Sequence, residues 1–97
     1  MSDIATLEPA EGRWLVVGAL TMDTVAALLA ASVDIALPES GTIDLARVEL
    51  VDSAGVALLL AWRRRAMVEH KTVTFSNVPP NLTSLAELYA VEEMLTT

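Results

Sequence analysis

The chain has 97 residues, the size of a single domain, and it contains no cysteine. Disulfides, thiolate metal sites and a cysteine nucleophile are therefore excluded. Its formal net charge of −7 opposes direct binding to nucleic acid phosphates and to anionic lipid headgroups.

The apolar pattern and the turn residues predict seven elements in one domain, residues 1–97. In chain order these are strands over 4–8 and 13–20, a helix over 22–33 capped by Thr21, a strand over 42–48, a helix over 54–70, a strand over 73–78, and a helix from about 81, with one more turn over 91–95. Alternation places Trp14 with Val16, and Ile43 with Leu45 and Arg47, on shared faces. The order β-β-α-β-α-β-α predicts an α/β fold, a mixed four-stranded sheet with helices packed against it.

The helix over 54–70 offers two apolar faces. We expect one face to be buried, with the residues Val56, Leu59, Leu60 and Met67. A second face carries Leu58, Trp62 and Arg65, and Trp and Arg are favoured anchors of protein interfaces. Two interpretations stay open for this face: it binds a partner, or Trp62 covers a neighbouring helix in the core.

Asp52, Ser53, Ala54 and Gly55 form the corner between a strand and this helix. Partners of open α/β sheets tend to bind at the carboxyl ends of strands. Asp52 or Ser53 can accept hydrogen bonds from the free N–H groups of the first helical turn. Gly55 leaves room for a partner backbone to approach. We therefore expect this corner to cap the helix and to contact a partner.

The hydrophobic fraction is 54%, above the roughly 45–50% usual for soluble domains. Either alanine accounts for the excess, or the isolated chain exposes an apolar surface that a partner covers, or that a second copy covers in a homodimer. The first residues resemble no secretory signal, and the longest apolar run, residues 56–62, is far shorter than the ~20 residues of a membrane span. We expect a cytoplasmic protein that meets a membrane only through a partner.

The sequence contains no recognisable catalytic or metal-binding motif. His70 is the only histidine, so neither a Cys/His metal cluster nor a Ser/His/Asp triad is expected. No phosphate-binding motif of the G-x-x-x-x-G-K-S/T type is present. We therefore expect no enzyme activity, no cofactor and no metal. The run Arg63-Arg64-Arg65 suits the negative end of a helix dipole, or else contacts an acidic protein surface.

Residues 43–60, with Ile43-Asp44-Leu45-Ala46-Arg47-Val48 followed by Val51-Asp52-Ser53-Ala54-Gly55, resemble the signature of STAS domains. The segment is most similar to the MlaB-type branch, the STAS subunit of Mla phospholipid ABC transporters, as is Leu85-Ala86-Glu87-Leu88-Tyr89. The resemblance implies a non-catalytic subunit that binds and stabilises the cytoplasmic ABC ATPase. It also implies that the hydroxyl residue directly after the Asp, here Ser53, lies at that contact.

A second branch of the family offers an alternative function. Anti-sigma factor antagonists bind a serine-kinase anti-sigma factor and resemble Asp-Ser-Ser-Gly, where the second hydroxyl residue is phosphorylated. Ala54 stands at that position here, so phosphorylation at the usual place is excluded and only Ser53 could substitute. A small hydrolase or ligand-binding protein is a third class, for which no nucleophile–base pair is evident.

Overall fold

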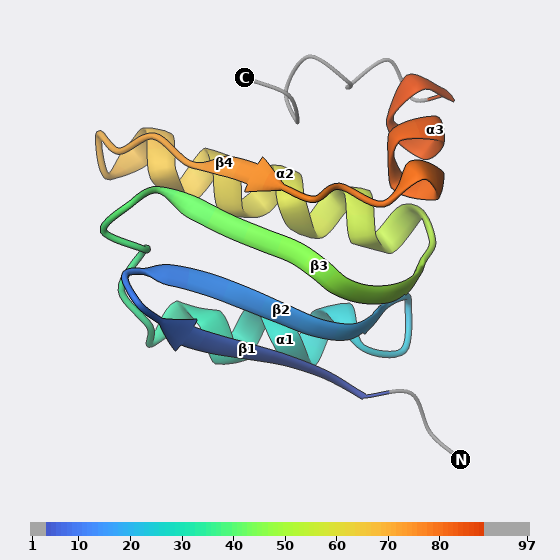
Figure 1. Cartoon of the computed structure of the whole chain (residues 1–97), viewed down its shortest axis with the longest axis horizontal. Helices are drawn as coiled ribbons and strands as arrows, with labels where there is room; N and C mark the ends of the chain where they lie inside the picture. The colour runs from blue at the N-terminus through green and yellow to red at the C-terminus, as the bar shows by residue number, and fades with distance from the viewer. Residues whose placement is uncertain (1–3, 89–97) are drawn as a thin grey trace.

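The predicted order of elements is confirmed in the structure, a computed structural model that describes residues 4–88. The elements are β1 (Ala5–Ala10), β2 (Arg13–Leu20), α1 (Val25–Val33), β3 (Thr42–Val51), α2 (Ser53–Val68), β4 (Thr74–Ser76) and α3 (Pro80–Leu88) (Figure 1). Tyr89 and the turn expected over 91–95 lie outside the described residues.

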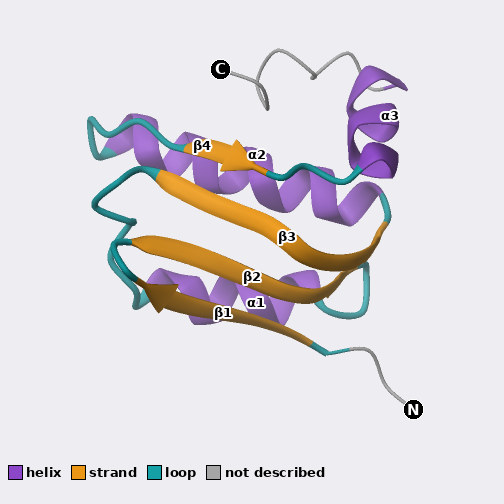
Figure 2. Ribbon diagram, viewed as in Figure 1, coloured by secondary structure: helices purple, strands orange, loops and turns teal. Residues whose placement is uncertain are grey.

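The sheet has the strand order β1-β2-β3-β4. β1 and β2 pair antiparallel around the Glu11-Gly12 turn, whereas β2, β3 and β4 pair parallel. Figure 2 shows α1 and α2 together on one side of the sheet, with α3 beyond the end of β4. Because β2, β3 and β4 run parallel, their carboxyl ends lie at the same end of the sheet, which we call its carboxyl edge.

The core lies between the sheet and the two helices α1 and α2. Trp14 and Val16 of β2 and Ile43 and Leu45 of β3 are at most 1% exposed, as their alternation predicts. On the helix side, Trp62 meets Trp14 edge to face, with ring centroids 5.4 Å apart. Both indole N–H groups are satisfied, because Trp14 donates to the Ala36 carbonyl at 3.0 Å and Trp62 to the Ser32 hydroxyl at 2.9 Å.

α1 begins at Val25, three residues later than the sequence predicts, and Thr21 is not its N-cap. The side chain of Thr24 folds back and donates to the Ala19 carbonyl at 2.6 Å, while its oxygen accepts from the Thr21 N–H at 3.0 Å. These bonds hold residues 21–24 as a tight turn at the end of β2. Met22 is consequently in a loop, where its side chain is 80% exposed.

β3 is three residues longer than predicted and is interrupted by register shifts. Val17 pairs with Arg47, although Leu15 pairs with Asp44, so β3 has one extra residue between these pairs. The extra residue places Arg47 on the same sheet face as Asp44. The prediction that Arg47 shares the face of Ile43 and Leu45 is therefore wrong. β4 is shorter than predicted, because Asn77 adopts a left-handed backbone with φ 55° and ends the strand.

Asp44 lies on the sheet face opposite the helices and is 5% exposed. Its carboxylate accepts from the Ala46 N–H at 2.9 Å, from the Asn77 amide at 3.0 Å and from the Arg13 guanidinium at 3.1 Å. The hydrogen bond from Asn77, that from Ala46 and the charge of Arg13 hold the pKa of Asp44 below 3.8, although burial opposes them. This carboxylate thus joins β2, β3 and the end of β4 at the irregular part of β3.

Replacing Asp44 with alanine is expected to lower the free energy of unfolding at neutral pH by about 2 kcal/mol, because three donors on β2, on β3 and after β4 lose the carboxylate that joins them. The pKa of Asp44 is lower in the folded chain than in the unfolded one. Its carboxylate therefore stabilises the fold above pH 3.8, and this contribution is lost as the pH falls through the folded-state pKa.

Urea unfolding of the wild type, Asp44→Ala and the exposed control Glu8→Ala, at neutral and at acidic pH, measures both effects. The difference between the wild type and Asp44→Ala should narrow on acidification, while Glu8→Ala should match the wild type at neutral pH within about 0.5 kcal/mol. A difference between the wild type and Asp44→Ala that does not change with pH would contradict the role given to the ionised carboxylate.

Candidate functional site

Asp52, one of the two capping residues that the sequence predicts, is the N-cap of α2. Its backbone is extended, with φ −120° and ψ −169°, and its carboxylate Oδ1 accepts from the Ala54 N–H at 2.8 Å. A carboxylate at this position satisfies one of the free N–H groups of the first turn and interacts favourably with the helix dipole. Asp52 therefore fixes where α2 begins and how Ser53, the first helical residue, is presented.

The second oxygen of Asp52 connects two loops. Oδ2 accepts from the Met22 N–H at 3.0 Å, and the Asp52 N–H donates to the Leu20 carbonyl at 3.1 Å. The loop after β2 and the start of α2 are thereby held together across the carboxyl edge of the sheet. The contact between Asp52 and Met22 could not be predicted from the sequence, because it depends on how the loop after β2 folds.

Gly55 serves the fold, and the prediction that it admits a partner backbone is wrong. The residue is buried, and a Cβ placed on it would lie 2.7 Å from Val51 Cγ1 and 2.9 Å from the Leu20 carbonyl oxygen. Only a glycine lets the first turn of α2 pack this closely against the ends of β2 and β3. The close approach that the sequence suggested is therefore internal.

Ser53 is exposed and Ala54 is half-buried beside it. Within the described residues the Ser53 hydroxyl makes no hydrogen bond. Two exposed apolar side chains flank this corner in the connected segments: Met22, 80% exposed, and Leu50, 52% exposed. The acidic residues Asp23 and Glu49 are exposed next to them in the chain. We call Met22, Asp23, Glu49, Leu50 and Ser53 the Ser53 surface.

Leu58, Trp62 and Arg65 do not form a partner-binding face. Leu58 is 1% and Trp62 is 0% exposed, so the alternative in which Trp62 covers a neighbouring helix is correct. Arg65 donates to the carbonyls of Ser32 at 2.8 Å and Ile35 at 2.7 Å, which neutralises the C-terminal end of α1. Its guanidinium also lies 5.8 Å from the centre of the Trp14 ring.

Met67, expected in the buried stripe of α2, is 65% exposed instead. The buried residues of α2 are Gly55, Val56, Leu58, Leu59, Trp62 and Ala66. The helix begins with apolar residues on every side, so its 3.6-residue period could not reveal which side meets the core. Trp62 settles the orientation, because its ring packs on Trp14 and its N–H needs Ser32.

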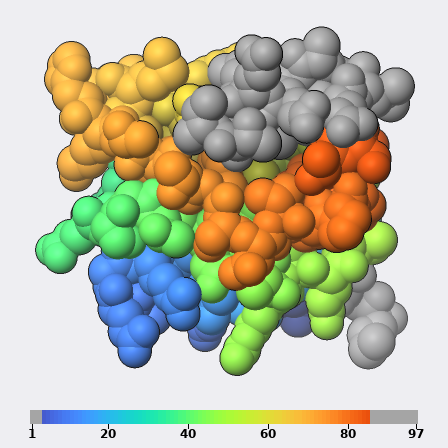
Figure 3. All heavy atoms as spheres, turned by 45° about the horizontal axis from the view of Figure 1, so that its top comes forward, coloured from blue at the N-terminus to red at the C-terminus, as the bar shows by residue number. Residues whose placement is uncertain are grey.

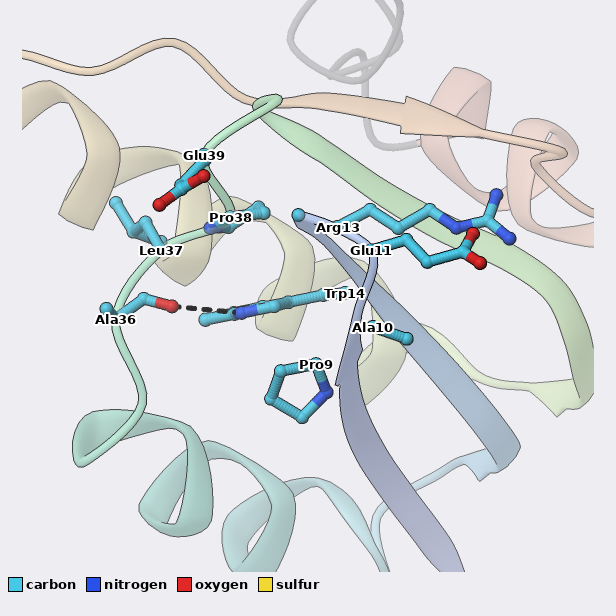
Figure 4. A pocket seen from close by; sticks show the side chains of 10 residues that line it. Pro9, Ala10, Glu11, Arg13, Trp14, Ala36, Leu37, Pro38 and Glu39 are labelled. Carbon is cyan, nitrogen blue, oxygen red and sulfur yellow. Dashed lines mark hydrogen bonds between the residues drawn. The ribbon is translucent and has the colours of Figure 1, made fainter.

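A hollow of about 330 Å³ lies at the opposite edge of the sheet, between the β1–β2 turn and the loop after α1. Figure 4 shows Pro9, Ala36 and Pro38 around the edge of the Trp14 ring, while Glu11 and Arg13 extend away from it. Trp14 is already hydrogen bonded to Ala36, and none of the predicted site residues lines this hollow. The Ser53 surface is therefore the candidate site.

The described residues offer no reactive centre for this surface. Among residues 4–88, no three His, Cys, Asp or Glu side chains are grouped so that they could hold a metal ion. In the same part of the chain, no helix has the length and apolar character needed to span a membrane. What the corner presents is an exposed hydroxyl, with exposed apolar and acidic residues in the two segments that meet there, a pattern suited to binding another protein.

A mixed four-stranded sheet with helices on one face and a capped Asp-Ser corner defines the class of protein as a STAS domain. The model of the family described as "Mlab, STAS domain" matches residues 6–96, and the chain belongs to this MlaB-type STAS family. No curated protein matches the chain. STAS domains are generally non-enzymatic regulatory domains.

Proposed function

We propose that this chain is the non-catalytic STAS subunit of an Mla-type phospholipid ABC transporter, and that it binds and stabilises the ATPase on the cytoplasmic side of the membrane. The membership in the MlaB-type family supports this proposal. The single observation that carries the contact is Ser53, exposed at the first turn of α2 and positioned by Asp52.

The chemistry of the Ser53 surface indicates the complementary surface on the ATPase. Met22 and Leu50 would enter apolar pockets, and their burial would supply most of the binding free energy. Asp23 and Glu49 would face basic side chains at the rim, which favour fast and selective encounter. The Ser53 hydroxyl would then make a hydrogen bond to the partner in a water-free centre.

Ala54 argues against the anti-sigma factor antagonist function. It occupies the position of the phosphorylated hydroxyl residue in that branch and has no hydroxyl to modify. A switch of that kind would have to use Ser53, where Asp52 already places a carboxylate beside the incoming phosphate.

Ser53→Arg and Met22→Asp are each expected to weaken binding to the transporter ATPase by about thirtyfold or more, the effect of losing roughly 2 kcal/mol at a central contact. Isothermal titration of the purified ATPase with each variant measures this loss. Thr6→Arg, which changes an exposed residue of β1, is the matched control and should bind like the wild type.

Circular dichroism melts of the three variants separate lost binding from lost folding, because all three positions are exposed. If folded Ser53→Arg and Met22→Asp bound the ATPase as tightly as the wild type, the Ser53 surface would not be the contact. If the wild type bound an anti-sigma kinase and no transporter ATPase, the proposed function itself would be wrong.

A further inference from the structure

The positive charge of the chain is concentrated near the end of α2. Residues 63–71 contain four of the six Lys and Arg residues and one of the thirteen acidic ones, so this segment carries a net charge of +3. The remaining 88 residues carry −10. A charge separation of this size produces a local positive potential on a protein that is otherwise acidic.

Part of this charge is used within the fold. Arg65 binds the carbonyls at the end of α1 and pairs with Glu69 at 2.7 Å. Arg64 is exposed, and the Lys71 side chain, 51% exposed, reaches Glu69 only at 3.9 Å. A pair at that distance on a protein surface contributes little. Arg64 and Lys71 therefore remain accessible to a partner.

Exposed apolar side chains lie among these cations. In the last turn of α2, Met67 is 65% exposed and Val68 is 79% exposed. Neighbouring exposed apolar side chains of this kind often mark a surface that a partner covers. Figure 3 shows the end of α2 and the segment after it, yellow to orange, projecting at the upper left corner of the molecule. We call Arg64, Met67, Val68 and Lys71 the α2 C-terminal surface.

A small crevice opens beside this surface, between the last turns of α2 and the segment that leads to β4. Its volume is about 100 Å³, and its lining includes Arg63, Met67 and Lys71. It is large enough for one side chain, and its cationic and apolar lining complements a carboxylate on a short apolar stem. A protruding acidic side chain fits this shape, whereas a flat surface would leave the crevice empty.

We propose that the α2 C-terminal surface binds an acidic, partly apolar peptide segment of a protein partner. The carboxylates would meet Arg64 and Lys71, and apolar side chains would cover Met67 and Val68. An anionic membrane is less suited to this surface, because the net charge of −10 on the rest of this small domain would approach it as well. Arg64, the member of this surface nearest to Ser53 along α2, lies about 17 Å away at the helical rise of about 1.5 Å per residue, so both surfaces can be occupied together.

Fluorescence anisotropy with two labelled peptides tests the proposal on the intact chain. One peptide is rich in Glu and contains two leucines, and the second has Gln in place of every Glu. The Glu peptide should bind more tightly than the Gln peptide, and added salt should weaken its binding. In the double variant Arg64→Glu with Lys71→Gln, its affinity should fall about tenfold. Met67→Ser with Val68→Ser should lower the affinity without changing the salt dependence.

Arg47→Glu is the charge-reversal control, since Arg47 is exposed on β3 away from α2, and it should leave the affinity unchanged. Ser53→Arg should also leave it unchanged, so a failure here is distinguishable from a failure of the proposed function. Equal binding of the two peptides, binding of neither, or an effect of Arg47→Glu as large as that of the double variant would overturn the proposal. So would binding to phosphatidylglycerol vesicles in the absence of peptide binding.

Discussion

Trp62→Ala is expected to lower the free energy of unfolding by about 4 kcal/mol, a large effect for a single truncation. The side chain is fully buried, its ring packs edge to face on Trp14, and its N–H donates to Ser32. A small domain has roughly 5–15 kcal/mol of stability in total, so this variant should be close to unfolding. Thermal and urea denaturation measure the loss.

Two variants of α2 make this prediction specific. Trp62→Phe keeps an aromatic ring against Trp14 but leaves Ser32 without its donor, and it should cost about half as much as Trp62→Ala. Met67→Ala removes an exposed apolar side chain from the same helix and should change the stability by less than about 0.5 kcal/mol. A Trp62→Ala protein that melts like the wild type but no longer binds its partner would restore Trp62 as an interface residue and contradict its position in the core.

Gly55→Val is expected to lower the free energy of unfolding by about 3 kcal/mol, because the new side chain would collide with the end of β2. The nearest obstacles to a Cβ include the Leu20 carbonyl oxygen at 2.9 Å, a backbone atom that cannot rotate away. The first turn of α2 would have to move outward, and the bond between Asp52 and Met22 would be strained with it. Binding through the Ser53 surface should weaken together with stability.

Ala57→Val measures the helix-propensity cost of valine without the steric collision expected at Gly55. Ala57 is exposed in the same helix, so its replacement carries only the helix-propensity cost of a β-branched residue, at most about 0.7 kcal/mol. Urea denaturation of the two variants gives the difference directly. If Gly55→Val cost no more than Ala57→Val, the close packing of α2 on β2 would not be a constraint on this sequence.

The order and pairing of the elements were predictable because the strands alternate strongly. Trp14 with Val16, and Ile43 with Leu45, are separated by less buried or polar residues, and the Glu11-Gly12 turn marks the hairpin. The boundaries were less predictable where tertiary contacts decide them. The sequence predicted Thr21 as the N-cap of α1, but Thr24 ends the turn because its hydroxyl reaches the Ala19 carbonyl.

The candidate site could be predicted in part. Asp52 as a cap and Ser53 as an exposed hydroxyl follow from a short motif between a strand and a helix, and local patterns of this kind are readable. Met22 and Leu50 could not be assigned to the candidate site from the sequence. Their exposure depends on the loop after β2 and on the irregular end of β3. Trp62 was open to two interpretations, since a tryptophan suits an interface as well as a core.

Hydrogen–deuterium exchange of the chain with and without the transporter ATPase tests the central claim most directly. On binding, we expect slower exchange in residues 21–24 and 50–57, the two segments that Asp52 holds together, and unchanged exchange in the β1–β2 turn. A stable complex in which these two segments exchange as fast as in the free chain, while another edge of the sheet becomes protected, would contradict it.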